Sequence, residues 1–179
     1  MLNKRLVVIG GGAAGFFCAI NAARLNPRLE VIILEKSGKL LSKVKVSGGG
    51  RCNVTHACFS IAEMIKKYPR GASFLKKAFH HFFTNDTIDW FAERGVVLKT
   101  ESDGRMFPVT DNSQTIIDCL LKEAKKFHVD IRMNQEVQQL TIGIGKPTGP
   151  NELEEAKQFD LRLAAVSYTH LTLPTIYSV

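Results

Sequence analysis

The hexapeptide Gly10-Gly11-Gly12-Ala13-Ala14-Gly15 constrains the fold more than any other feature of the sequence. It follows a β-branched apolar run, residues 5–9, and opens a run of helix formers that ends at Asn26-Pro27. A further apolar run, residues 30–34, comes next. A strand–helix–strand unit of this kind closes with two parallel strands. The sequence therefore predicts an α/β fold with a parallel sheet, whose first two strands are buried on both faces.

Three glycines of this loop have distinct predicted roles. Gly10 permits a tight turn, Gly12 lets the backbone approach a pyrophosphate, and Gly15 lets the helix pack close to the strand. The free N–H groups at the helix N-terminus then face the diphosphate. Glu35 ends the second strand, where a carboxylate accepts hydrogen bonds from ribose hydroxyls. Because this acid would repel a 2′-phosphate, the site favours NAD or FAD over NADP, and spacing alone does not separate NAD from FAD. The alternative is a glycine-rich turn without a ligand.

A second glycine cluster is Ser47-Gly48-Gly49-Gly50-Arg51-Cys52-Asn53. It lies in residues 36–58, which lack apolar periodicity and are predicted to form a long loop. Three glycines in a row suggest a backbone pressed against a flat or charged ligand. Arg51 and the preceding lysines would stabilise phosphate charge or a reduced, anionic flavin ring. These lysines are Lys36, Lys39, Lys43 and Lys45. The alternative is a flexible, solvated loop.

The rest of the chain predicts a helical insertion followed by a helix and a small antiparallel meander. Residues 60–94 have helical periodicity, with Gly95 as the C-cap of the last helix, and Asn112 or Ser113 caps a later amphipathic helix. The remaining expected elements are strands at 96–99 and 105–109, the helix at 113–127, strands at 129–133, 137–142 and 159–164, and a turn at 143–151.

The net charge of +7 is concentrated in one part of the sequence. Residues 36–80 carry ten basic side chains and one acidic side chain. Such a segment suits nucleic acid, a membrane surface or a phosphorylated small molecule. We interpret its second half as a solvated helix face with Lys66, Lys67, Arg70, Lys76 and Lys77, beside core aromatics at Phe79, Phe82, Phe83, Trp90 and Phe91. A small-molecule substrate is therefore expected rather than a nucleic acid, and RNA binding through the basic segment remains the alternative.

Cysteines and histidines give weaker signals. The four cysteines form no CxxC pair, so reduced thiols and a cytoplasmic protein are expected. Cys52 lies next to Arg51, from which we predict a lowered thiol pKa. Cys52 and Cys58 do not match the redox motif of flavin disulfide reductases. The histidines lack the spacing of metal ligands, and no apolar run is long enough for a transmembrane helix.

Taken together, three segments resemble one family of bacterial NAD(P)/FAD-dependent flavoproteins. They are LVVIGGGAAGFFCAINAA at residues 6–23, LEK at 34–36 and KVKVSGGGRCNVTHAC at 43–58, and GRMFPVT at 104–110 resembles another motif of the family. The family is typified by the BaiN and YhiN proteins and is also called aminoacetone-oxidase-like. The resemblance covers roughly residues 4–165.

The resemblance implies a glutathione-reductase-like FAD-binding Rossmann domain and a flavin-dependent oxidoreductase, with NAD(P)H as an electron donor. It implies that Gly10 to Gly15 bind the diphosphate and Glu35 the adenosine ribose. It further implies that Ser47 to Asn53 lie along the ribityl chain and flavin, and that the backbone of Val137 touches the adenine. No catalytic acid or base is predicted.

Members of this family are longer than this chain. Residues 1–165 are therefore expected to be the N-terminal, incomplete part of the domain, with its helical insertion at about 56–110. The last fourteen residues, 166–179, are expected to be foreign, because the first six of them, Val166 to Leu171, resemble the in-frame translation of a transposon-end sequencing adapter. A further alternative is that a truncated chain of this kind holds no cofactor and is inert.

Overall fold

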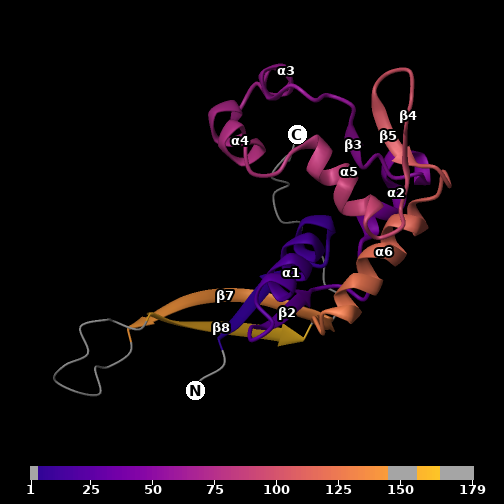
Figure 1. Cartoon of the computed structure of the whole chain (residues 1–179). Coiled ribbons are helices and arrows are strands. Elements are labelled where there is room, and N and C mark those ends of the chain that lie inside the picture. The colour runs from indigo at the N-terminus through magenta and orange to yellow at the C-terminus, as the bar shows by residue number, and fades with distance from the viewer. Residues whose placement is uncertain (1–3, 145–156, 166–179) are drawn as a thin grey trace. The chain divides into compact units, whose positions relative to one another are not determined.

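The computed structural model describes residues 4–144 and 157–165. The chain divides into two compact units. The first contains the described residues of 4–40 and 124–165, and the second contains residues 41–123. Each unit is described by itself below, with the element labels of Figure 1. Residues 145–151 of the turn expected at 143–151 and the expected foreign tail lie outside the described residues.

The first unit contains the predicted parallel sheet. Its three strands are β1 (Arg5–Ile9), β2 (Glu30–Glu35) and β6 (Asp130–Met133), in the order β1-β2-β6. Both pairings are parallel, with Val7 opposite Ile32 and Ile33 opposite Ile131. The helix α1 (Ala13–Leu25) connects β1 to β2 and packs against both strands. The prediction of a strand–helix–strand unit with parallel strands is thus confirmed.

Burial differs between the first two strands. The four central residues of β2 are buried, as predicted. The prediction that β1 is buried on both faces is wrong, because none of its residues is buried and Ile9 is 58% exposed. The physical reason is position, since β1 forms the edge of the described sheet whereas β2 lies in its centre. The core of this unit comes from β2 and from one face of α1, with Phe16, Ala19 and Ile20 fully buried. Each large apolar side chain buried in this way stabilises the fold by about 1.5–3 kcal/mol.

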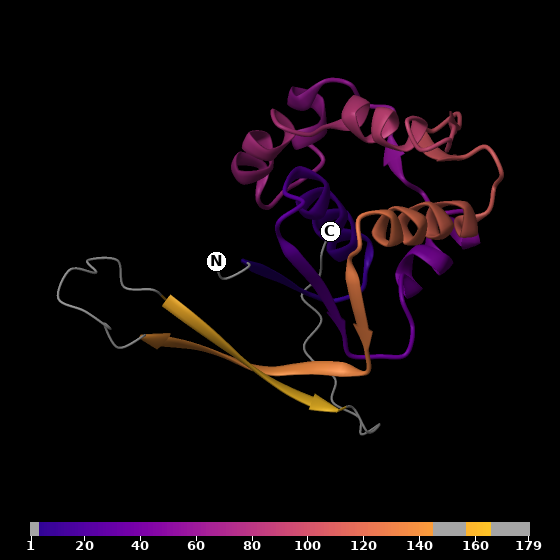
Figure 2. The ribbon, with the colours of Figure 1, turned by 60° about the horizontal axis from the view of Figure 1, so that its bottom comes forward.

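A two-stranded antiparallel sheet follows β6 in the first unit. It pairs β7 (Gln135–Ile144) with β8 (Lys157–Ala165), and Figure 2 shows β7 continuing directly from β6. A register shift interrupts the pairing between Val137 and Gln139. The two predicted strands of the meander are therefore present, although β7 continues through Gly143, where the turn was expected to begin.

The second unit begins with a short helix that the sequence analysis missed. The helix α2 (Ser42–Gly50) lies inside the segment predicted to be a loop, but its backbone leaves helical geometry from Ser47 to Gly49. Its helical part is one turn, in which the buried Val44 packs inward and Lys45 N–H donates to Leu41 O. A single turn is too short to show helical periodicity, which is why the loop prediction was wrong there.

The helical insertion contains three helices in this unit, α3 (Ile61–Ile65), α4 (Ala72–Phe79) and α5 (Thr84–Ala92). The predicted role of Gly95 is confirmed, because it adopts φ 77° while its own N–H bonds to Ala92 O and Val96 N–H bonds to Phe91 O. This bond pair is a Schellman motif. Trp90 and Phe91 are buried as expected for core aromatics, whereas Phe82 is 37% exposed and only partly contributes to the core.

A small antiparallel sheet and a long helix complete the second unit. The strand β5 (Arg105–Pro108) pairs with β4 (Leu98–Thr100) and with β3 (Thr55–His56). The helix α6 (Ser113–Lys126) begins in this unit, and Asn112 caps it by accepting from Gln114 N–H at 2.9 Å. Both the strand pair and the helix were predicted. Among the described residues, no helix is long and apolar enough to span a membrane.

Candidate functional site

The first glycine loop connects β1 to α1 and has the geometry that its sequence predicts. Gly10 has φ 105°, which permits the tight turn. A Cβ on Gly15 would lie 2.0 Å from the carbonyl oxygen of Gly10, so only glycine allows this approach of helix to strand. A Cβ on Gly12 would meet no atom within 4 Å, so Gly12 faces open space. The loop is therefore tightly packed at Gly15 and accessible at Gly12.

The start of α1 is a free backbone donor site. Gly12 is its N-cap, none of the described side chains caps the helix, and its first turn carries no acidic residue. Ala13 and Ala14 are exposed. The first N–H groups of a helix have no partner within the helix, and the helix dipole adds positive charge there. An anion such as a diphosphate fits this position without displacing a side chain.

Glu35 holds the loop from the end of β2. Its Oε2 accepts a hydrogen bond of 2.8 Å from Gly11 N–H. Gly11 is buried, and a Cβ on it would lie 2.8 Å from Leu40 Cδ2 and 3.2 Å from Glu35 Cβ. A side chain at Gly11 would therefore crowd both Leu40 and the acid, and glycine favours the close contact with Glu35.

The second carboxylate oxygen of Glu35 is also fixed. Ser37 donates both its N–H and its hydroxyl to Glu35 Oε1, each at 2.8 Å. Burial raises the pKa of Glu35, but the hydrogen bonds from Gly11 and Ser37 outweigh burial and lower the pKa below its ordinary value. Asn134 N–H donates to Ser37 O at 3.3 Å and so supports this turn from the end of β6. The carboxylate is therefore charged and oriented, with lone pairs left to accept further donors.

Three other predicted site residues show no specific role in the structure. Lys36 and Lys43 are exposed, and the charge of Lys36 contributes to lowering the pKa of Glu35. Val137 is half-buried in β7, opposite Leu163 and beside the register shift. Gly10 to Gly15, Glu35 and Val137 all belong to the first unit, whereas Lys43 and the second glycine loop belong to the second.

The second glycine loop has a left-handed backbone at several consecutive positions. Gly48, Gly49 and Gly50 have φ of 56°, 70° and 86°. A Cβ on Gly48 would lie 2.7 Å from the ring of Phe107 in β5, so glycine is required there for close packing. Ser47 Oγ donates to Val44 O at 3.0 Å and closes the preceding helical turn. The glycines thus let the loop fold back on itself and lie against β5.

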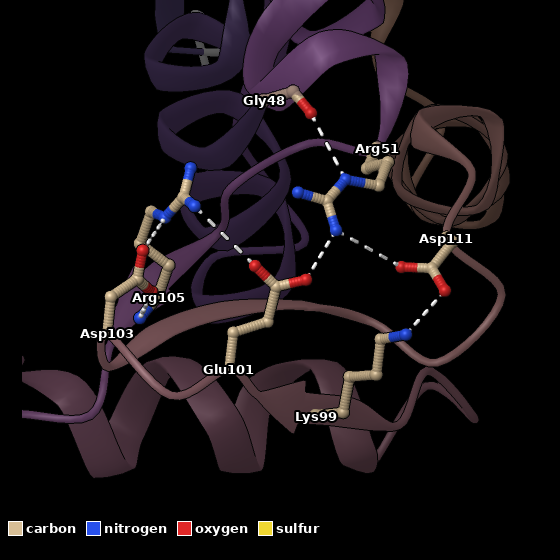
Figure 3. Close-up of polar contacts among 7 residues, drawn as sticks. All are labelled: Gly48, Arg51, Lys99, Glu101, Asp103, Arg105 and Asp111. Atoms are coloured by element: carbon tan, nitrogen blue, oxygen red, sulfur yellow. Dashed lines mark hydrogen bonds and ion pairs between the residues drawn. The ribbon is translucent and has the colours of Figure 1, made fainter.

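Arg51 attaches this loop to the β4–β5 hairpin (Figure 3). Its guanidinium lies 4.0 Å from the centre of the Phe107 ring and donates to Gly48 O at 3.4 Å. It also donates to Glu101 and lies 3.7 Å from an oxygen of Asp111. The hydrogen bond to Glu101 raises the pKa of Arg51. The cation predicted to serve a ligand therefore has acidic partners in its own unit, and its contact with a cofactor stays a prediction.

The hairpin continues this charge network (Figure 3). Lys99 donates to Asp111, and Arg105 lies 3.6 Å from Glu101. Arg105 also donates to Asp103, through its N–H at 3.1 Å and its Nε at 2.6 Å, and the backbone bond is the main cause of the lowered pKa of Asp103. The basic residues of the hairpin are thus paired with carboxylates.

The environment of Cys52 contradicts the predicted lowering of its thiol pKa. Cys52 has φ 65°, which is strained for a residue with a side chain, and it is buried. Burial raises the pKa of its thiol, and this effect is larger than the lowering by the hydrogen bond with Ser47. The predicted lowering of the pKa is therefore wrong. The prediction failed because the charge of Arg51 is directed at Glu101 and Asp111. Asn53 is exposed and follows Cys52 beside Gly48.

Sequence reasoning missed the residues that support the two loops. Ser37 had a detectable signal, since a serine two residues after an acid can donate back to it. Glu101, Phe107 and Asp111 had none, because they contact Arg51 from about fifty residues away in the chain. Among the described residues, no cluster of histidine, cysteine or acidic side chains is arranged to hold a metal ion.

Comparison with known proteins identifies relatives that are longer than this chain. Residues 4–164 match the HI0933-like protein Rossmann domain. The chain is 33% identical over 131 residues to a ribosomal RNA dihydrouridine synthase of Escherichia coli K12, covering 73% of this chain and 31% of that protein. It is 29% identical over 139 residues to a 3-dehydro-bile acid delta(4,6)-reductase of Clostridium scindens, covering 78% and 33%. The chain thus spans about a third of the length of these curated relatives.

Solved structures share the fold at low sequence identity. An open-conformation flavocytochrome c3 fumarate reductase aligns with a TM-score of 0.58 at 21% identity, over 79% of this chain and 28% of that chain. A 3-ketosteroid-delta4-(5alpha)-dehydrogenase of Rhodococcus jostii RHA1 aligns with a TM-score of 0.57 at 17% identity, over 79% and 40%. These likenesses confirm the Rossmann-type α/β fold. Because the family model matches most of the chain, including both glycine loops, this protein belongs to the HI0933-like Rossmann family.

Proposed function

We propose that this chain is the FAD-binding part of a flavin-dependent oxidoreductase. The observation that carries the proposal is the hydrogen bond between Glu35 Oε2 and Gly11 N–H, which joins the acid after β2 to the glycine loop after β1. This pairing of loop and acid is typical of dinucleotide sites, where the loop binds a diphosphate and the acid binds an adenosine ribose. FAD, once bound, would supply the redox chemistry of the protein.

The residues of the first unit fit the adenosine diphosphate half of FAD. The diphosphate would lie at the N-terminus of α1, where Gly12 leaves open space and the N–H groups of Ala13 and Ala14 can donate. The charged carboxylate of Glu35 would accept the ribose hydroxyls. The resemblance implies that Ser47 to Asn53 lie along the ribityl chain and flavin and that the backbone of Val137 touches the adenine. NAD(P)H is the proposed electron donor.

A second candidate concerns the substrate, and one observation favours RNA over a small molecule. Four basic side chains of the α3–α4 region lie exposed with no carboxylate partner among the described residues, unlike those of the hairpin in Figure 3. Two of the relatives are named as ribosomal RNA dihydrouridine synthases, and another as a reductase of bile acids. We propose that the protein reduces a base in RNA, with a steroid-like molecule as the competing substrate class.

The FAD proposal is tested by titrating the chain with two nucleotides and following binding by calorimetry. ADP is expected to bind, and ADP with a 2′-phosphate is expected to bind more weakly because Glu35 repels the added charge. The variant Glu35→Gln should lose most of this discrimination. Equal affinity for both nucleotides in the wild-type chain would contradict the role of Glu35.

A further inference from the structure

The helices α3 and α4 with the turn between them form a basic surface of the second unit. Within residues 61–79 there are five basic side chains and one acidic side chain. All five basic side chains are exposed: Lys66, Lys67, Arg70, Lys76 and Lys77. We call these five residues, together with Phe74, the α3–α4 surface. The two helices contact each other, as Figure 1 shows.

Most of the positive charge on this surface is unpaired. Lys66 forms an ion pair of 2.6 Å with Glu63, the acidic residue of this segment. The side chains of Lys67, Arg70, Lys76 and Lys77 contact no carboxylate in the part of the chain that the structure describes. By contrast, the basic residues of the same unit that Figure 3 draws, Arg51, Lys99 and Arg105, each have an acidic partner. Four unpaired cations therefore lie on α4 and on the turn that connects α3 to α4.

An aromatic ring stands among these cations. Phe74 is 77% exposed and lies three residues before Lys77 on α4, so the two side chains are neighbours on the helix. Neither α3 nor α4 buries a side chain completely, so this pair of helices contributes more to the surface than to the core. An exposed ring gains no stability for the fold, but it can stack on the face of a nucleic-acid base.

We infer that the α3–α4 surface binds single-stranded RNA. Unpaired lysines and an arginine neutralise phosphates, and an exposed aromatic ring stacks on an unpaired base, which together are the chemistry of single-strand recognition. An acidic protein would also bind the positive charges, but it would offer no base on which the ring of Phe74 could stack. This inference adds to the proposed function the surface that binds the substrate. It rests on the proposed function only for the reduction of the RNA base by the flavin.

The test measures the anisotropy of a fluorescein-labelled oligouridylate with the whole chain at several salt concentrations. The affinity should fall with salt, because each neutralised phosphate of a single strand contributes about −0.7 to the slope of log K against log salt. The double variant Lys76→Gln/Lys77→Gln should bind more weakly, with a slope shallower by about 1.4. Phe74→Ala should weaken binding by about fivefold or more with an unchanged slope, since it removes stacking and no charge.

The matched control is Lys125→Gln/Lys126→Gln. Both lysine pairs are consecutive and lie in the last turn of a helix, so both substitutions remove the same charge from a helix C-terminus. The control should bind RNA like the wild type. Equal losses in the two double variants, no RNA binding at low salt, or binding to anionic phosphatidylserine vesicles but not to RNA would overturn the inference. FAD titration of the same variants keeps the two proposals apart, since loss of RNA binding should leave FAD affinity unchanged.

Discussion

The carboxylate of Glu35 accepts a 2.8 Å hydrogen bond from the backbone N–H of Gly11. This bond connects the end of β2 to the loop after β1, so the acid shapes the loop as well as offering oxygen to a ribose. A substitution at Glu35 should therefore affect both the stability of the loop and the affinity for a nucleotide.

The lowered pKa of Glu35 predicts a specific pH dependence of stability. Because the folded-state pKa lies below the ordinary value of 4.5, the ionised carboxylate stabilises the fold above that value, and this stabilisation is lost as the pH falls through the folded pKa. Wild type and Glu35→Gln should differ in Tm at neutral pH, and the difference should shrink in acid. Thermal unfolding followed by circular dichroism at a series of pH values measures it. A difference that stays constant into strong acid would contradict the assignment.

Two glycines of the first loop should respond differently to alanine. Gly15→Ala places a Cβ 2.0 Å from the Gly10 carbonyl oxygen and should destabilise the chain by about 1–3 kcal/mol or more. Gly12→Ala meets no atom within 4 Å and has an ordinary backbone geometry, so it should unfold like the wild type. Denaturant unfolding of both variants tests this difference. Gly12→Ala should nevertheless weaken nucleotide binding, because its methyl group occupies the space proposed for the diphosphate.

Cys52 should be a slow nucleophile. Burial raises the pKa of its thiol, so less thiolate is present at neutral pH than in an exposed cysteine. Cys18 is exposed and serves as the internal control. Limited alkylation with iodoacetamide followed by peptide mass spectrometry should show Cys18 modified before Cys52. Faster modification of Cys52 would restore the activated thiol that the sequence suggested.

Arg51 should stabilise the second glycine loop through both its charge and its planar shape. Arg51→Lys keeps the charge but loses the guanidinium that contacts Glu101, Gly48 and the Phe107 ring together. The variant should therefore have a Tm lower than that of the wild type by a few degrees. Glu101→Gln should lower the Tm of the wild type by more than it lowers the Tm of Arg51→Lys. A double-mutant cycle measures this coupling. Additive effects of the two substitutions would show that the ion pair does not hold the loop.

The features that sequence reasoning predicted depend on local signals. The loop Gly10 to Gly15, the strand β2 and the Gly95 cap each follow from residues adjacent in the chain. The exposure of β1 depends on its place at the sheet edge, which no local pattern contains. The partners of Arg51 could not be predicted for the same reason, since Glu101 lies fifty residues away. The pKa of Cys52 was predicted with the wrong sign because it depends on the burial of the thiol, which the neighbouring residues in the chain do not indicate.

The central proposal is that Glu35 and the first glycine loop bind FAD, and a titration with matched variants tests it most directly. Glu35→Gln loses the charged acceptor, whereas Glu30→Gln at the other end of β2 loses only an exposed ion pair with Arg5. Flavin fluorescence during titration with FAD should show binding by the wild-type chain and by Glu30→Gln, and an affinity about tenfold weaker for Glu35→Gln. A wild-type chain that unfolds cooperatively yet binds no FAD, or equal affinity in all three proteins, would contradict the account.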